Sequence, residues 1–237
     1  MYKKLELLSK SKHKNLQLDE LKDLEFAQEA HLITLGLSEI ARLSSLLPII
    51  ITGGKVQQFA VFTALSNQKN YFSTNVCKDI YLPMSIRSYP FTMVDTYEEG
   101  NPDKKLRAVA IDIESKYIGT KKVHPLFAAD GSLGDFTKKK VQIAQNFEQD
   151  KSNAQRLILA LRENNLLDKR SFEIKTQEGQ VKVLLSDFYV VNREKLFKLD
   201  DSLLLKWSKN GWLFAIESHI NSIEQINVLL KQFLIQK

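Results

Sequence analysis

The chain has almost no cysteine, the residue whose disulfides stabilise small secreted proteins, and it has no long apolar run. Its 237 residues include one cysteine, Cys77, so an internal disulfide cannot form and multi-cysteine zinc sites are excluded. The longest apolar run, residues 46–51, is far shorter than the ~20 residues of a membrane-spanning helix. We therefore do not expect a membrane permease.

The first residues, MYKKLELLSKSKHKNLQL, also lack the features of a Sec signal peptide. They contain no continuous apolar region and no A-x-A-like cleavage site. We therefore expect a cytoplasmic protein. The alternative is the cell surface, reached by an export route that needs no signal peptide.

What is present is the composition of a soluble globular protein, with 43% hydrophobic and 26% charged residues. The 34 Lys and Arg residues exceed the 28 Asp and Glu residues, for a formal net charge of +6. The lysines occur in small groups with acidic neighbours, whereas a nucleic-acid binder concentrates positive charge on one face. We therefore expect no nucleic-acid partner.

The apolar patterns predict an α+β fold, with a mixed, mainly antiparallel sheet flanked by helices. Residues 49–52 and 56–65 read as strands, and residues 172–191 as a β-hairpin. Residues 137–165 have helical spacing, which the polar residues 150–153 are expected to interrupt. We predict a single compact domain over residues 1–237, with a weak seam near residue 150.

Two further segments carry specific predictions. Residues 222–236 form an amphipathic C-terminal helix, with Ser222 as its N-cap, and residues 212–217 fit a strand or a buried helix. Residues 81–94 contain two prolines, so this segment is expected to be an edge strand or an ordered loop.

Motifs for nucleotides, metals and nucleophilic catalysis are missing. The sequence has no GxGxxG, GxxxxGK[ST], GxSxG or HExxH, and none of its four histidines pairs with another at metal-ligand spacing. We therefore assign no catalytic residue, metal or cofactor. Whether the protein is an enzyme stays open, and the missing motifs favour a non-enzyme.

One segment suggests a binding site. Arg87 offers a planar fork suited to a carboxylate, and Tyr89 and Phe91 alternate with it on an extended backbone. With Asp112 and His219 nearby, these residues would converge on one pocket for a peptide or a small carboxylate. The alternative is a structural edge strand whose arginine pairs internally.

Several motifs occur in the order typical of the SapC family and cover nearly the whole chain. They are HLITLGLSEIARLSSLLPIII (31–51), FTALSNQKNYFS (62–73), YLPMSIRSYPF (81–91), Ile111-Asp112, LFAADG (126–131), VVNREKL (190–196) and SHINSI (218–223). The chain thus resembles this family of bacterial proteins.

The resemblance implies a role at the bacterial surface layer. The partners would be a surface-layer protein or its assembly and export machinery, and a homo-oligomer is compatible with that role. Other members resemble companions of oxidative tailoring enzymes. This implies, as an alternative, a cytosolic accessory protein or enzyme that binds a peptide or a small carboxylate.

Overall fold

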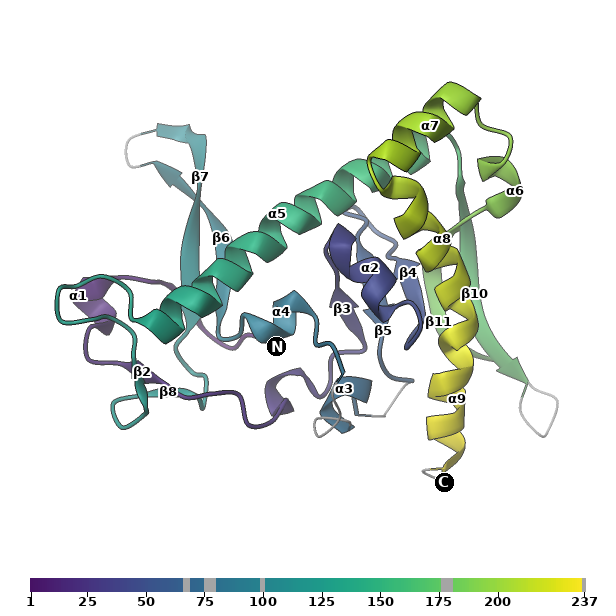
Figure 1. The fold of residues 1–237 in the computed structure, drawn as a ribbon. Helices are drawn as coiled ribbons and strands as arrows, with labels where there is room; N and C mark the ends of the chain where they lie inside the picture. The colour runs from purple at the N-terminus through teal and green to yellow at the C-terminus, as the bar shows by residue number, and fades with distance from the viewer. Residues whose placement is uncertain (66–68, 75–79, 99–100, 176–180, 236–237) are drawn as a thin grey trace.

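Antiparallel strand pairing organises the chain into three sheets that helices flank (Figure 1). The computed structural model describes residues 1–65, 69–74, 80–98, 101–175 and 181–235. Every strand pair in these ranges is antiparallel. The predicted α+β class with a mainly antiparallel sheet is therefore confirmed. The single-domain assignment stays a prediction, and Cys77 lies outside the described residues.

The largest sheet has five strands, and two of its three inner strands are entirely apolar and buried. In spatial order its strands are β10 (Leu167–Lys175), β11 (Val181–Val191), β4 (Ile49–Ile51), β5 (Phe59–Phe62) and β3 (Leu32–Thr34). The sequences III of β4 and FAVF of β5 suit strands covered on both faces. The expected hairpin is confirmed as β10–β11, and its turn lies outside the described residues.

Two smaller sheets lie towards the other end of the molecule (Figure 1). One consists of β1 (Leu5–Leu7), β7 (Asn101–Asp112) and β6 (Phe91–Glu98) in that spatial order. The other consists of β8 (Ile118–Gly119), β2 (Gln17–Leu18) and β9 (His124–Pro125).

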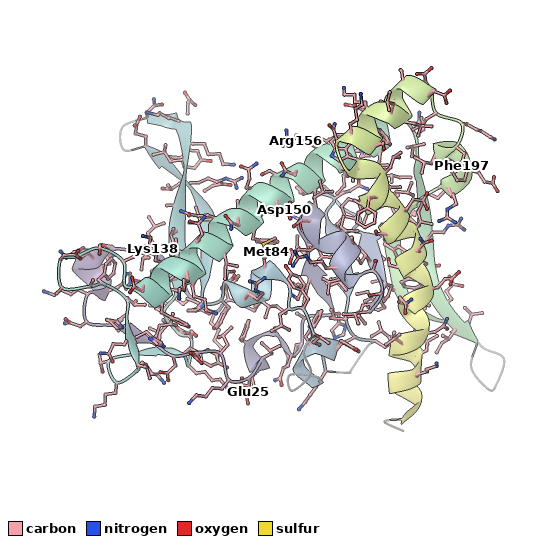
Figure 2. The ribbon with its side chains drawn as sticks, in the orientation of Figure 1. Glu25, Met84, Lys138, Asp150, Arg156 and Phe197 are labelled. Atoms are coloured by element: carbon pink, nitrogen blue, oxygen red, sulfur yellow. The ribbon has the colours of Figure 1, made fainter. Side chains whose placement is uncertain are left out.

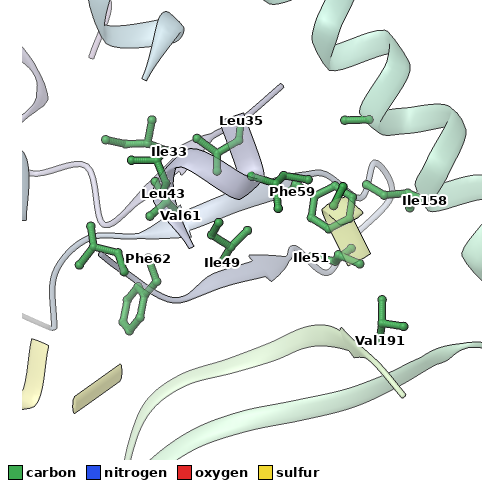
Figure 3. Packing of buried hydrophobic residues seen from close by; sticks show 14 of the residues in the cluster. Ile33, Leu35, Leu43, Ile49, Ile51, Phe59, Val61, Phe62, Ile158 and Val191 are labelled. Carbon is green, nitrogen blue, oxygen red and sulfur yellow. The ribbon is translucent and has the colours of Figure 1, made fainter. Parts of the chain in front are cut away.

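Two hydrophobic cores result from this arrangement. The first lies on the five-stranded sheet, under α2 (Leu37–Leu43) and α8 (Trp212–Ser222), and Figure 3 shows its packing around Ile49, Phe59 and Val61. The second lies on the smaller sheets and consists of Leu18, Tyr89, Phe91, Ile111, Tyr117, Leu126 and Val141. Phe26, in the short 3-10 helix η1 (Glu25–Ala27), packs against both cores.

Helix α5 (Asp135–Glu163) joins the two cores as one rod (Figure 1). Its 29 residues correspond to about 44 Å at 1.5 Å per residue. Val141 packs in the second core, whereas Leu157 and Ile158 pack in the first. The expected interruption at residues 150–153 is wrong, because these polar residues lie within a helix whose apolar face continues on both sides of them.

The C-terminal segment is also helical, but it begins earlier than predicted. α8 is followed directly by the 3-10 turn η2 (Ile223–Gln225) and by α9 (Ile226–Ile235), which settles residues 212–217 as helix. Ser222 does not act as the predicted N-cap, because it is the fully buried last residue of α8 and its side chain makes no capping bond to η2. Its hydroxyl donates to the His219 carbonyl at 2.6 Å and accepts from the Ile49 amide at 2.9 Å.

Short helices connect the remaining elements. They are α1 (Lys10–His13), α3 (Tyr71–Thr74), α4 (Met84–Arg87), α6 (Arg193–Leu196) and α7 (Asp201–Lys209). Among the described residues, none of the helices combines the length and apolar character needed to span a membrane.

The segment 81–94 is an edge strand only in its last part, because residues 91–94 belong to β6, the outer strand of its sheet, whereas the stretch between the two prolines is not extended. Pro83 caps one helical turn, α4, and β6 begins only at Phe91, after a cis Tyr89–Pro90 bond. The Met84 amide, at the start of this turn, donates to the buried Glu39 carboxylate at 2.6 Å. A partner distant in the sequence therefore stabilises the turn.

The start of α2 is held by the middle of α5. Asp150, labelled on α5 in Figure 2, accepts hydrogen bonds from the Ser38 amide at 2.9 Å and from the Ser38 hydroxyl at 2.6 Å. A Cβ on Gly36 would lie 2.3 Å from the Asp150 carboxylate, so only glycine permits this approach. A negative charge at a helix N-terminus is stabilising. Asp150 is therefore a docking point between α5 and α2.

We predict that Asp150→Ala lowers the free energy of unfolding by about 1–2 kcal/mol, because the start of α2 loses an accepting carboxylate. Urea unfolding followed by tryptophan fluorescence measures the change. Lys139→Ala, at an exposed position of the same helix, is the matched control and should change stability by less than about 0.5 kcal/mol. Equal stabilities for the two variants would contradict the docking role.

Candidate functional site

Arg87 contacts an aromatic ring within the fold. Its guanidinium lies 5.5 Å from the centre of the Tyr81 ring, and Arg42 lies 5.0 Å from the same ring. The Arg87 carbonyl accepts a hydrogen bond from Lys140 Nζ at 2.7 Å. Burial, together with the positive charge of Arg87, lowers the pKa of Lys140 to about 8. Arg87 is therefore surrounded by cationic and aromatic groups of the protein itself.

Tyr81 is anchored by a buried carboxylate. The Tyr81 hydroxyl donates to the Glu39 carboxylate at 3.0 Å. The Glu39 carboxylate also accepts a hydrogen bond from the Gly36 amide at 3.0 Å. Glu39 is fully buried, and burial raises the pKa of its carboxyl despite these donors. The first half of the segment 81–91 is thus tied to α2.

The second half is tied to a second buried carboxylate, Asp112. The Tyr89 hydroxyl donates to it at 3.0 Å, and the backbone amides of Lys3 and Lys4 donate at 3.0 and 2.9 Å. Asp112 is fully buried. Burial, with the neighbouring carboxylate, raises the pKa of Tyr89 far above its ordinary value. Phe91 lies in the same core, and its carbonyl accepts from the Tyr2 hydroxyl at 3.3 Å.

His219 lies apart from these residues, in the first core. It is fully buried on α8, and its Nε2 accepts from the Val191 amide at 3.2 Å. Its ring meets Phe59 edge-on at 5.5 Å. Burial lowers the pKa of His219 to about 4. The structure therefore brings Tyr89, Phe91 and Asp112 together, but places His219 in a different core.

A cleft lies beside Tyr89, on the side of the second core that faces the first. Its volume is about 620 Å³, and four aromatic rings line it: Tyr2, Phe26, Tyr89 and Tyr117. Phe26 and Tyr89 stack at 3.8 Å between ring centres, and Tyr117 meets Tyr89 edge-on at 6.3 Å. We call this cavity the aromatic cleft. Arg87, Phe91, Asp112 and His219 do not line it.

The hydroxyl of Tyr117 is held by an acidic residue behind the cleft. It donates to Asp23 Oδ1 at 2.7 Å, and burial together with this carboxylate raises the pKa of Tyr117 to about 12. Lys116 contacts Asp23 at 2.7 Å and Glu25 at 2.5 Å. One of the two lysines at the cleft is thus already paired with two carboxylates.

The charge balance of the aromatic cleft is negative, although the chain is basic. Its lining includes the acidic residues Glu25, Glu29 and Glu114 and the basic residues Lys3 and Lys116. Counting Asp23 and the Met1 amino group as well gives four carboxylates against three amino groups. Figure 2 shows Glu25 at the lower edge of the molecule, between the two halves. The cleft therefore suits a cationic group better than a carboxylate.

A second cavity adjoins the first. It has a volume of about 240 Å³ and shares Met1, Tyr2 and Ala30 with the aromatic cleft. Its other lining residues come from β3, α4, β6 and α5, together with Gln58: Leu32, Ile33, Thr34, Ser85, Thr92, Phe147 and Lys151. We call it the edge groove, because β3 is an outer strand of the five-stranded sheet. The two cavities lie between the two cores.

Sequence reasoning missed most of this lining. Residues 16–30 are polar with sparse apolar positions, so nothing in their pattern singles out Phe26. Tyr2 and Tyr117 are isolated in the sequence, and only folding places them beside Tyr89. Among the described residues, no group of three His, Cys, Asp or Glu side chains could hold a metal ion.

These observations define an α+β protein with two cores and an aromatic cleft between them. The family model SapC matches residues 8–229, so the chain belongs to the SapC family. No curated protein and no solved structure matches the chain.

Asp112→Ala should lower the free energy of unfolding by about 3 kcal/mol, because the Tyr89 hydroxyl and the Lys3 and Lys4 amides lose their acceptor. Tyr89→Phe removes only one of these donors and should cost about 1 kcal/mol. Chemical denaturation of both variants tests this order. Glu114→Ala, an exposed carboxylate two residues away, is the control and should be close to neutral. A neutral Asp112→Ala would show that this carboxylate is not structural.

His219 should make stability depend on pH in a defined window. Its folded pKa of about 4 lies below the ordinary 6.5, so the unfolded chain binds the additional proton. Stability contributed by the neutral ring is complete above pH 6.5 and falls as the pH drops towards 4. Between pH 7 and 5 the loss should be about 2 kcal/mol.

Urea unfolding at pH 8, 7 and 5 measures this effect in the wild type and in His219→Gln. The difference in stability between the two proteins should stay constant from pH 8 to pH 7. It should then shrink by about 2 kcal/mol at pH 5. A constant difference at all three pH values would contradict the burial of a neutral imidazole.

Proposed function

We propose that the protein is a non-enzymatic, surface-layer-associated or assembly protein that binds a segment of a surface-layer protein or of its assembly machinery. Family membership supports the surface-layer role. The observation that carries the binding role is the aromatic cleft between the two cores. Tyr89, one of the residues singled out in the sequence, lines this cleft, whereas Arg87 does not.

The lining of the cleft favours a polypeptide as the ligand. Aromatic side chains are enriched where proteins bind one another, because they bury a large area and order few rotatable bonds. The rim adds exposed charged groups, Lys3, Glu29 and Glu114, for which no ion pair is formed within the described residues. An apolar floor with a charged rim is the usual anatomy of a protein-binding site.

The alternative role, as a cytosolic accessory protein or enzyme for a peptide or a small carboxylate, receives less support. It needs Arg87, Asp112 and His219 around one ligand, and these residues lie in separate surroundings. The negative charge balance at the aromatic cleft also disfavours a carboxylate there. A peptide ligand is common to both roles, so cellular location separates them.

The test uses affinity-tagged full-length protein expressed in its native bacterium. After fractionation, we expect the protein to sediment with the surface layer and to co-precipitate a surface-layer or assembly protein. The double variant Glu29→Lys and Glu114→Lys should reduce this co-precipitation about tenfold, because it reverses two charges at the rim of the aromatic cleft.

The matched control reverses two other exposed carboxylates, Glu194→Lys and Glu224→Lys, on α6 and η2. It carries the same change in net charge and should leave co-precipitation within about twofold. Protein found only in the cytosol, with no surface-layer protein bound, would refute the proposed role. Equal losses in both double variants would assign the effect to net charge.

A further inference from the structure

We propose that β3 accepts an extended segment of the partner as an additional strand, with a lysine or arginine side chain of that segment in the aromatic cleft. This inference rests on the proposed function, because it names how the partner is bound. It draws on three observations: the free backbone groups of β3, the absence of charges and bulges at this edge and the charge of the adjoining cleft.

The register of β3 shows which backbone groups face outward. In antiparallel pairs, residues alternate between bonding to the partner strand and pointing away from it. The Leu35 amide donates to Phe59, and the His31 carbonyl accepts from Thr63, so residues 31, 33 and 35 bond to β5. Leu32 and Thr34 therefore direct their amides and carbonyls to the open side.

These outward groups are almost entirely free. The Thr34 carbonyl accepts one weak bond from the Ser85 hydroxyl at 3.3 Å. The Leu32 amide and carbonyl and the Thr34 amide have no partner among the described residues. The edge groove lies along these same residues, so a peptide backbone in the groove would be beside three unused hydrogen-bonding groups.

The two outer strands of the five-stranded sheet differ in how they are protected. Natural proteins defend exposed edges with charged side chains and bulges. β10, at one edge, carries Lys169, Arg170 and Glu173, and its register with β11 is broken twice. β3, at the other edge, reads LIT, has no charge or bulge, and leaves Leu32 37% exposed. β3 is short, which by itself limits pairing, but it has no charge or bulge that would repel an added strand.

The adjoining cleft indicates the charge of the occupant. The edge groove and the aromatic cleft share Met1, Tyr2 and Ala30, so one extended segment can run along both cavities. Successive side chains of a strand point to opposite faces, so alternate residues of the segment would face the cleft. The negative rim and the aromatic rings suit the ammonium or guanidinium group and the apolar stem of a lysine or arginine.

The binding test uses fluorescein-labelled hexapeptides and fluorescence anisotropy with the full chain. The probe is Thr-Val-Lys-Val-Lys-Val, capped at its C-terminus as an amide, and the charge control replaces both lysines by glutamate. Two further probes carry N-methyl groups on the odd or on the even amides. In a strand, only one of these two sets bonds to β3.

We expect the lysine probe to bind at least about tenfold more tightly than the glutamate probe. One N-methylated probe should bind with the affinity of the lysine probe. The other should bind about tenfold more weakly, which is the effect of losing one or two hydrogen bonds. Equal loss with both N-methylated probes, equal affinity for lysine and glutamate, or no binding at millimolar peptide would each overturn the proposal.

A protein variant tests the same edge. Leu32→Pro removes one outward amide, so the affinity for the lysine probe should fall about tenfold. Proline is tolerated at such a position, because the strand amide there faces solvent. Leu32→Ala keeps the amide, so its affinity for the lysine probe should stay within about threefold of the wild-type affinity. If Leu32→Pro does not fold, the N-methylated probes decide the question. If the wild type forms dimers and Leu32→Pro abolishes them, the edge of β3 pairs with a second copy of this chain, and the proposal is overturned.

The outcome is separable from that of the proposed function. Surface-layer association that survives in Leu32→Pro would refute strand addition and leave the proposed function standing. Binding of the lysine probe with the expected N-methyl pattern, in a protein found only in the cytosol, would refute the surface-layer role and leave strand addition standing.

Discussion

Buried carboxylates are the constraint on which the rest of this structure depends. A carboxylate without water needs hydrogen-bond donors, and Glu39 and Asp112 obtain theirs from segments distant in the sequence. Tyr81 and Met84 bond to Glu39, whereas Tyr89 bonds to Asp112. The segment between these anchors is therefore fixed at both ends. It carries the chain from the first core to the second and places Tyr89 at the cleft.

The same constraint explains where the binding surface lies. The amides of Lys3 and Lys4 bond to Asp112, which holds the N-terminal residues between the cores, beside Phe26 and Tyr89. Helix α5 spans both cores and bonds through Asp150 to the start of α2, so the two walls of the cavities are connected. A groove between two cores tied in this way keeps its shape when empty, which reduces the entropy lost on binding.

Local patterns in the sequence predicted the elements whose apolar periodicity is long. The α5 helix, the β10–β11 hairpin, the strands β4 and β5 and the C-terminal helix all follow from spacing alone. Prediction failed where a partner distant in the sequence outweighed local preference. Pro83 and Pro90 suggested an extended segment, but the Glu39 carboxylate bonds to the first amide of α4 and stabilises a helical turn there. Asp150 and its polar neighbours suggested a break, but Asp150 bonds to Ser38 of another helix.

The residues predicted to bind a ligand are likewise placed by contacts between segments that are distant in the sequence. Tyr89, Phe91 and Asp112 lie together because β6 and β7 pair, and this pairing was not predicted from the sequence. The position of His219 in the other core depends on how α8 packs, and short-range periodicity contains no information about that. The sequence by itself determined the fold class and the strongly periodic elements, which follow from local apolar patterns, and the family, which follows from the order of its motifs. Only the tertiary structure decided which side chains share a cleft and which strand edge stays open, because both depend on contacts between segments far apart in the chain.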